Sequence, residues 1–256
     1  MGKIRTIQSI DRTVMILNYI AKHNNNVRFI DISNDLNLKK GTLHGILSTL
    51  EYNNLLSKDK DTNRYSLGIK LYEFGKIYEE DFSIKKIVRP YLEKLGEKFS
   101  ETIHLAIESD YEVLYIDRVK SSHSVRMASK IGHNDPLYCS AIGKVILANM
   151  ENERLKYYLE NYRLYKRTEN TITDKKNLKN ELDKIKNDGY SIDNEELEAG
   201  LICVASPIKN QSGDLIAVIS ISGPTSRISK DEFENMESTI IETSKIISES
   251  IGYKNI

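Results

Sequence analysis

The chain has 256 residues, of which 39% are hydrophobic and 29% charged, and its formal net charge is +0. This composition is ordinary for a globular protein, and no apolar run approaches the roughly 18 residues that cross a bilayer. The charged start is not followed by an apolar stretch, so we expect no signal peptide. Cys139 and Cys203 stand far apart, which favours free thiols and a cytoplasmic protein.

Charge is unevenly distributed along the chain. Residues 1–70 carry 11 Lys and Arg against 6 Asp and Glu, and the remainder carries the compensating acidic excess. A basic first quarter on an acidic body favours contact between the N-terminal segment and a polyanion such as nucleic acid. An excess of this size also arises by chance, so it does not settle the question alone.

The basic segment begins with two predicted helices. Apolar residues at helical spacing predict an amphipathic helix over 6–22, and they are Ile7, Ile10, Val14, Leu17 and Ala21. A shorter helix over 29–36 turns Ile32 and Leu36 inward. Asn37 then suits a sharp turn, because asparagine tolerates left-handed backbone better than most residues.

A third predicted helix, over about 40–53, has two unlike faces. One is an apolar stripe of Leu43, Ile46, Leu47 and Leu50. The other is small, polar or basic and contains no acid; it consists of Lys39, Lys40, Thr42, His44, Gly45, Ser48 and Thr49. Helices that face water usually mix both charge signs, whereas a face that meets phosphates and base edges excludes carboxylates. We interpret it as a DNA-facing helix; the alternative is a solvated face that lacks acids.

Two strand-like runs around an Asp-Thr-Asn turn then predict a β-hairpin over 55–68. Lys58, Lys60 and Arg64 are expected at its tip. Three helices followed by such a hairpin are typical of a winged helix-turn-helix over residues 1–68. The alternative is a hairpin that only caps a helical bundle. A helix over 69–81 is the predicted linker.

The remaining segment, 82–256, alternates between helices and strands. Helices are predicted over 82–99, where Pro90 could bend the chain, and over 140–150, 174–188 and 230–251. Strands are predicted over 102–108, 112–119, 124–129, 201–206 and 215–222. Hairpins between strands, with helices packed against them, indicate an α+β sensor domain with a mostly antiparallel sheet.

Four stretches, in order along nearly the whole chain, carry a family resemblance. They are LKKGTLHGIL at 38–47, RYSLG at 64–68, IGHNDPLYCSAIGK at 131–144, and GYSIDNEE at 189–196 with GLICVASP at 200–207 and ISISGP at 219–224. The chain resembles the IclR family of bacterial transcription regulators. The resemblance implies a winged helix-turn-helix, a linker helix and a GAF-like α/β effector-binding domain. It also implies a homodimer, and often a homotetramer, that binds double-stranded DNA.

The resemblance, with the interpretation of the third helix, assigns two sets of site residues. At the DNA site, Lys39, Lys40, Lys58, Lys60 and Arg64 would contact phosphates, and Thr42, His44 and Ser48 would face base edges. At the effector site the implied residues are Met127, Ala141, Ile142, Asp193, Cys203, Ser220 and Ser222. Ser220 and Ser222 alternate on one strand face, and a helix N-terminus at Ala141 favours an anion, so a small organic or sugar acid suits the site.

Gly45 departs from the family pattern. Many members place an arginine directly after the histidine of this helix, where it could bind guanine or phosphate. Glycine does neither and costs roughly 1 kcal/mol of helix stability relative to alanine. The operator sequence therefore cannot be taken over from relatives.

Two other classes of function compete with a ligand-responsive regulator. His104, His133, Asp193 and Cys203 are common in metal and nucleophile chemistry, but no metal, phosphate-loop or nucleophile motif surrounds them, so we expect neither an enzyme nor a cofactor. The C-terminal domain could instead serve oligomerisation only. For a regulator, we expect effector binding to act through the linker helix on the spacing of paired recognition helices.

Overall fold

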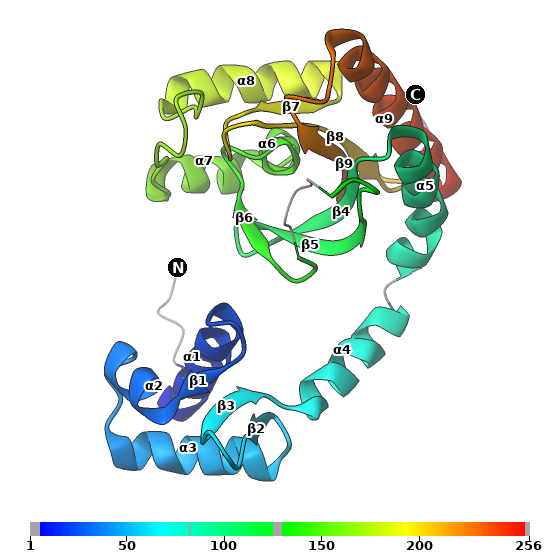
Figure 1. Cartoon of the computed structure of the whole chain (residues 1–256). Helices are drawn as coiled ribbons and strands as arrows, with labels where there is room; N and C mark the ends of the chain where they lie inside the picture. Colours follow the sequence, from blue (N-terminus) through cyan, green and yellow to red (C-terminus); the bar gives the residue numbers. More distant parts are fainter. Residues whose placement is uncertain (1–5, 82, 125–129, 254–256) are drawn as a thin grey trace. The chain divides into compact units, whose positions relative to one another are not determined.

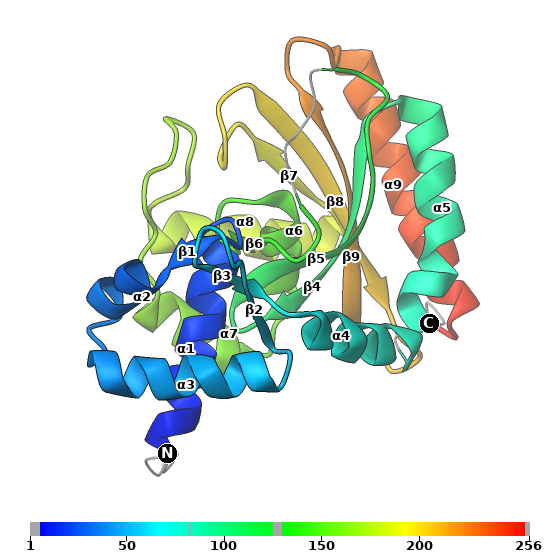
Figure 2. The ribbon, with the colours of Figure 1, turned by 60° about the horizontal axis from the view of Figure 1, so that its bottom comes forward.

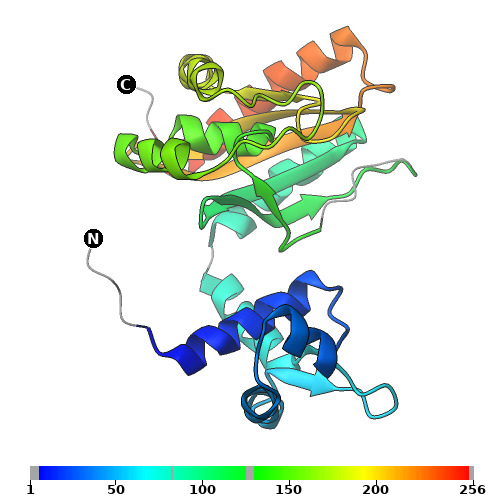
Figure 3. The ribbon, with the colours of Figure 1, turned by 90° about the vertical axis from the view of Figure 1, so that its left-hand side faces the viewer.

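The computed structural model describes residues 6–81, 83–124 and 130–253, and its internal contacts divide the chain into two units after Ser83. The N-terminal unit contains α1 (Gln8–Lys22), β1 (Val27–Arg28), α2 (Phe29–Asp35), α3 (Lys40–Tyr52), β2 (Leu56–Lys58), β3 (Arg64–Leu67) and α4 (Ile69–Asp81). Figure 3 looks along α3, with the β2–β3 hairpin extending to one side. This order confirms the winged helix-turn-helix.

The turn between α2 and α3 depends on Asn37. Its φ is 49°, the left-handed conformation that the sequence predicted for this position. The turn directs the apolar stripe of α3 inward, where Leu43, Leu47 and Leu50 are buried. These side chains pack with Ile16 and Ile20 of α1 in one core.

The first helix presents a different face to this core from the one expected. Ile16 and Ile20 are fully buried, whereas Ile7, Ile10 and Val14 are at least half exposed. The predicted apolar stripe does lie along one side of the helix, but Ile7, Ile10 and Val14 of this stripe point away from the core of the unit. Helical spacing groups residues on one side without showing which neighbour that side meets.

The wing has a third strand that the sequence pattern does not predict. The sheet order is β1-β3-β2, and Val27 pairs with Tyr65 in antiparallel register. A two-residue strand has no periodicity of its own, so only its partner reveals it. Lys58 ends β2 and Arg64 begins β3, so Lys60 alone of the three predicted cations stands in the turn, beside Asp59 and Asp61.

The C-terminal unit is built on one fully antiparallel six-stranded sheet of order β6-β5-β4-β9-β8-β7. The strands are β4 (Thr102–Ser109), β5 (Glu112–Val119), β6 (Asn134–Pro136), β7 (Ser191–Asn194), β8 (Leu201–Lys209) and β9 (Leu215–Pro224). The helices are α5 (Ser83–Phe99), α6 (Ala141–Ala148), α7 (Asn152–Asn161), α8 (Lys175–Asp188) and α9 (Lys230–Ser250). The expected α+β fold with an antiparallel sheet is confirmed (Figure 1).

Helices cover both faces of this sheet. Figure 2 shows α5 and α9 side by side on one face, joined by a 2.8 Å hydrogen bond from Lys98 Nζ to Thr239 Oγ1. The opposite face packs against α6, which itself contacts α8. Helix α6 can lie against the backbone of Leu137 because residue 143 is glycine. A Cβ at this position would lie 2.3–2.6 Å from the Leu137 backbone.

Three short elements of this unit are not predicted from the sequence pattern: β6, α7 and β7. Strand β7 is polar because its inward residues Ser191 and Asp193 face a polar interior. The predicted strand over 124–129 falls largely on residues outside those described. No helix of the described residues is long and apolar enough to cross a membrane.

Candidate DNA interface and effector site

The basic and polar face of α3 is exposed, as a nucleic-acid contact requires, although exposed Glu51, seven residues after His44, lies on the same side of the helix. Lys39, Lys40, His44 and Ser48 are exposed, and Thr42 is half-buried beside the core. His44 Nδ1 lies 3.5 Å from Ser48 Oγ, one helical turn further along the same face. The chain thus leaves basic and polar groups on the surface of a helix whose other side is fixed by leucines.

The wing supplies fewer available charges than expected. Arg64 donates a hydrogen bond of 3.2 Å to the carbonyl of Asn26, which ties it to β1. Lys58 is half-buried, with Nζ 5.6 Å from the centroid of the Tyr65 ring. Lys60 is exposed in the turn, where the Asp59 carboxylate accepts hydrogen bonds from Thr62.

Gly45 lies on the exposed face of α3. No atom lies within 4 Å of the position that a Cβ would occupy there. A larger side chain would therefore point outward from this face, so packing does not require glycine at this position.

On the α6 side of the C-terminal sheet, strand pairing aligns polar residues into two rows. Asp193, Cys203, Ser222 and Thr102 are consecutive cross-strand partners. The next row consists of Ser191, Ala205, Ser220, His104 and Arg118. Paired residues point to the same face, so the structure brings together the four effector-site predictions that lie on strands.

Burial keeps several of these groups uncharged. His104 Nδ1 lies 3.4 Å from Ser220 Oγ, and its ring centroid is 4.9 Å from that of Tyr115. Desolvation, aided by the charge of Arg118, lowers the pKa of His104 to about 3, so its imidazole is neutral near pH 7. Burial likewise raises the pKa of the Cys203 thiol well above its ordinary value.

Asp193 is the carboxyl group of the first row. Its Oδ1 accepts hydrogen bonds from the backbone amides of Glu196 and Leu197, at 2.7 and 3.3 Å. Although those amides favour the charged form, burial dominates and raises its pKa to about 7. Asp193 is therefore partly protonated near neutral pH and can act as a hydrogen-bond donor.

The N-terminus of α6 presents free backbone donors. Ser140 caps the helix by accepting a hydrogen bond from the amide of Gly143 at 3.1 Å. Among the described residues, none accepts a hydrogen bond from the amides of Ala141 or Ile142. Ser191 of β7 donates to the Ala141 carbonyl at 2.7 Å, which ties this helix end to the strand that carries Asp193.

Five residues of these rows were not among the predicted effector residues, and two of them, Thr102 and Arg118, carry polar groups that no described residue pairs with. Thr102 is buried, and its Oγ1 has no hydrogen-bond partner among the described residues. Arg118 is half-buried and forms no ion pair with a described carboxylate. Only the register of β4 with β9 and β5 places them here, so no local sequence signal could have identified them. Met127, the remaining predicted residue, lies outside the described residues.

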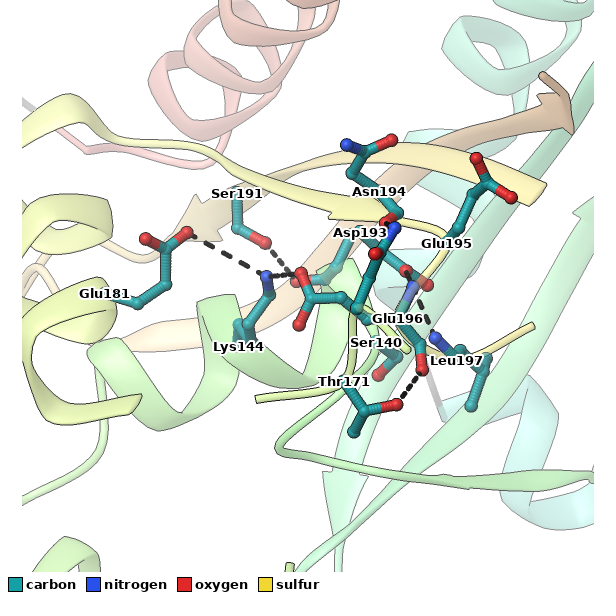
Figure 4. Close-up of polar contacts among 12 residues, drawn as sticks. Ser140, Lys144, Thr171, Glu181, Ser191, Asp193, Asn194, Glu195, Glu196 and Leu197 are labelled. Atoms are coloured by element: carbon teal, nitrogen blue, oxygen red, sulfur yellow. Dashed lines mark hydrogen bonds and ion pairs between the residues drawn. The ribbon is translucent and has the colours of Figure 1, made fainter. Parts of the chain in front are cut away.

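A buried ion pair connects α6 to the segment after Asp193 (Figure 4). The Lys144 side chain is only 1% exposed and binds the carboxylate of Glu196, with Glu181 of α8 at 3.9 Å. Thr171 Oγ1 donates to the Glu196 carbonyl at 2.7 Å, so the 168–171 segment also holds this loop. No sequence motif indicates this pair, because 52 residues separate its members.

The raised pKa of Asp193 predicts a pH dependence of stability. Because the unfolded chain loses this proton near the ordinary pKa of 3.8 and the folded protein near 7, rising pH in that interval should destabilise the fold. Relative to Asp193→Asn, the free energy of unfolding of the wild type should fall by up to about 1.4 kcal/mol per pH unit. Urea unfolding from pH 4 to 8 measures this, with exposed Asp183→Asn as control. A constant difference across that range would contradict the assignment.

Comparisons with known proteins agree with this architecture. Residues 9–60 match the IclR helix-turn-helix domain, and residues 78–249 match the bacterial transcriptional regulator IclR C-terminal family. The transcriptional repressor IclR of Escherichia coli is 30% identical over 248 residues, which cover 96% of this chain and 90% of the relative.

Solved structures give the same result. The Thermotoga maritima IclR structure has a TM-score of 0.75 and 33% identity, and it covers 97% of this chain and 100% of its own. An IclR homologue from Microbacterium hydrocarbonoxydans, crystallised with 4-hydroxybenzoate, shares the fold with a TM-score of 0.84 at 21% identity, covering 95% and 98% of the two chains. The chain belongs to the IclR family of bacterial transcriptional regulators.

Proposed function

We propose that this regulator binds a specific operator in double-stranded DNA through α3, and that a small organic or sugar acid bound on the α6 side of the C-terminal sheet modulates this binding. Its DNA target places it in the cytoplasm. The observation that carries the proposal is a set of polar groups on that side that lack partners within the described part of the chain. They are two backbone amides, one hydroxyl and one guanidinium without an ion pair.

The chemistry of these groups favours an oxygen-rich anion. The amides of Ala141 and Ile142 and the dipole of α6 attract negative charge. Arg118 adds a guanidinium, which suits a carboxylate, and protonated Asp193 can donate a hydrogen bond to it. Ser220, Ser222 and Thr102 supply hydroxyls for the ligand's own oxygens, which is why we include hydroxy and sugar acids.

At the operator, we propose that Lys39 and Lys40 contact phosphates while Thr42, His44 and Ser48 face base edges in the major groove. Lys58, Lys60 and Arg64 would contact the backbone beside it, with Arg64 contributing least because Asn26 already binds it. The exposed surface of α3, where Glu51 is the one carboxylate among basic and polar groups, supports this assignment.

One such helix reads too few base pairs for a specific site, so we propose that the working form is a homodimer. Two such dimers could associate as a homotetramer. The exposed apolar residues Ile7, Ile10 and Val14 lie on one side of α1, where a second copy of the chain would cover them. Effector binding would then act through α4 on the spacing of the two recognition helices.

Loss of the effector groups should abolish stabilisation by the ligand. A screen of small organic, sugar and aromatic acids by thermal shift should yield a compound that adds roughly 2.7 kcal/mol at 100 times its Kd. Ser220→Ala combined with Asp193→Ala should remove this gain, and Arg118→Gln should reduce it, whereas exposed Ser238→Ala on α9 should not. If every class of acid leaves the wild type unchanged, the C-terminal unit serves oligomerisation instead.

Removal of the α3 lysines should weaken DNA binding and its salt dependence. We would select the operator from random duplexes with the full chain, and then measure affinity against salt concentration. For Lys39→Gln/Lys40→Gln, the slope of log K against log salt should fall by about 0.9 for each phosphate that the protein no longer neutralises. Gly45→Arg should act in the opposite direction, because the position is open and exposed. Lys179→Gln on α8 is the control, and an unchanged slope in the double variant would refute the interface.

A charge on the exposed side of α1 should dissociate the dimer. Sedimentation velocity should show a dimer for the wild type and for Ser9→Glu, whose exposed side chain lies on another side of α1 from Val14. Val14→Glu should sediment as a smaller species and bind the operator more weakly, because a carboxylate cannot be buried unpaired in an apolar contact. An unaltered dimer in Val14→Glu would place the interface elsewhere.

A further inference from the structure

A hollow of the C-terminal unit is lined by residues of α7, of β6 and of the loops beside them. Figure 1 shows where α7 and β6 lie. The volume of the hollow is about 400 Å³, within the range of small-molecule sites. Five tyrosines and two arginines line it, together with Glu112 and Pro136. It shares no lining residue with the proposed effector site, so the regulator function does not account for it.

The rings of this hollow form a connected aromatic wall. Tyr158 and Tyr162 of the α7 region stack with ring centroids 4.6 Å apart, and Tyr111 meets Tyr162 at 5.3 Å. Tyr138 is buried, and its hydroxyl donates to the Tyr165 carbonyl at 2.8 Å while accepting from the Tyr165 amide at 3.1 Å. That hydroxyl is already engaged, so polar anchoring of a ligand must come from the rim.

Tyr111 adopts a left-handed backbone conformation, which is unfavourable for a bulky residue. Asp110 and Tyr111 form the turn between β4 and β5 with φ values of 51° and 62°. Such turns favour Asn-Gly, and a bulky side chain there is uncommon. Glu108 accepts a 2.9 Å hydrogen bond from the Tyr111 amide, and Arg154, ion-paired to Glu108, lies 5.1 Å from the ring centroid. The fold thus maintains a strained turn that keeps this ring against α7.

The rim carries positive charge that no carboxylate of the described residues pairs with. Arg163 and Arg167 are both exposed, and neither forms an ion pair there. The Arg163 guanidinium lies over the Tyr165 ring, 5.0 Å from its centroid. Glu112 is the one acidic group in the lining and opposes anion binding from the sheet side.

We propose that this hollow is a second ligand site and that it binds a small aromatic carboxylate. The ring of the ligand would stack on Tyr162 and Tyr111, and its carboxylate would accept hydrogen bonds from Arg163 and Arg167. The aromatic wall selects a planar ring, and the two guanidinium groups select the anion over a neutral analogue.

Isothermal titration of the full chain with benzoate tests the proposal, with cyclohexanecarboxylate and benzyl alcohol as probes that each lack one recognised feature. Benzoate should bind at least about tenfold more tightly than either. Arg163→Gln/Arg167→Gln should weaken benzoate at least about tenfold. Lys166→Gln, an exposed neighbour, and Ser220→Ala, in the separate effector site, should leave its affinity within about twofold.

Four results would overturn this assignment. The first is a wild type that does not bind benzoate, and the second is cyclohexanecarboxylate that binds as tightly, which would show that the rings are not recognised. Binding abolished in Ser220→Ala but kept in the arginine variant would assign benzoate to the effector site. The fourth result would come from sedimentation of the wild type and of Arg163→Gln/Arg167→Gln. If the wild type is an oligomer that dissociates in this variant, the face is a contact between copies of the chain.

Discussion

The C-terminal unit depends on one buried charge pair, Lys144 with Glu196. An ammonium group that is almost fully removed from water is tolerated only when a partner neutralises it, and removal of one partner typically costs about 3–5 kcal/mol. The pair also fixes geometry, since the Glu196 amide donates to Asp193 and Lys144 lies one turn into α6. One interaction therefore holds together the helix end with free amides and the strand end with the carboxyl group.

The polar face beside that pair is costly to the folded protein. Thr102 Oγ1 and Glu196 Oε2 are buried without hydrogen-bond partners in the described residues, and burial pushes Asp193 toward its neutral form. Groups of this kind lower stability unless a ligand satisfies them. The opposite face of the same sheet also buries polar groups, but they meet partners on the helices that cover it: Ser206 bonds Ser244 of α9 at 2.6 Å, and Asp117 pairs with Arg89 of α5 at 3.0 Å.

In the N-terminal unit, the two sides of α3 have separate roles. Buried leucines on one side of α3 set its position, so the exposed side is free to vary in chemistry without loss of the fold. Gly45 illustrates this freedom, because nothing surrounds the site of its absent Cβ. In the proposed interface, the lysines at the start of the helix supply affinity for DNA, and short polar side chains select the bases.

The amino-acid sequence by itself determined the helices with strong periodicity, the left-handed turn at Asn37, the antiparallel sensor fold and the family. It also identified Asp193, Cys203, Ser220 and Ser222, through resemblance, as residues that the strand register then aligned. Only the tertiary structure decided which side of α1 is buried, that β1 and β7 are strands, that Arg118 and Thr102 lie in the rows that contain the predicted effector residues, and that Lys144 pairs with Glu196. The physical reason is that periodicity reports a residue's neighbours along its own element, whereas partners brought together from distant parts of the chain are specified only by packing and register.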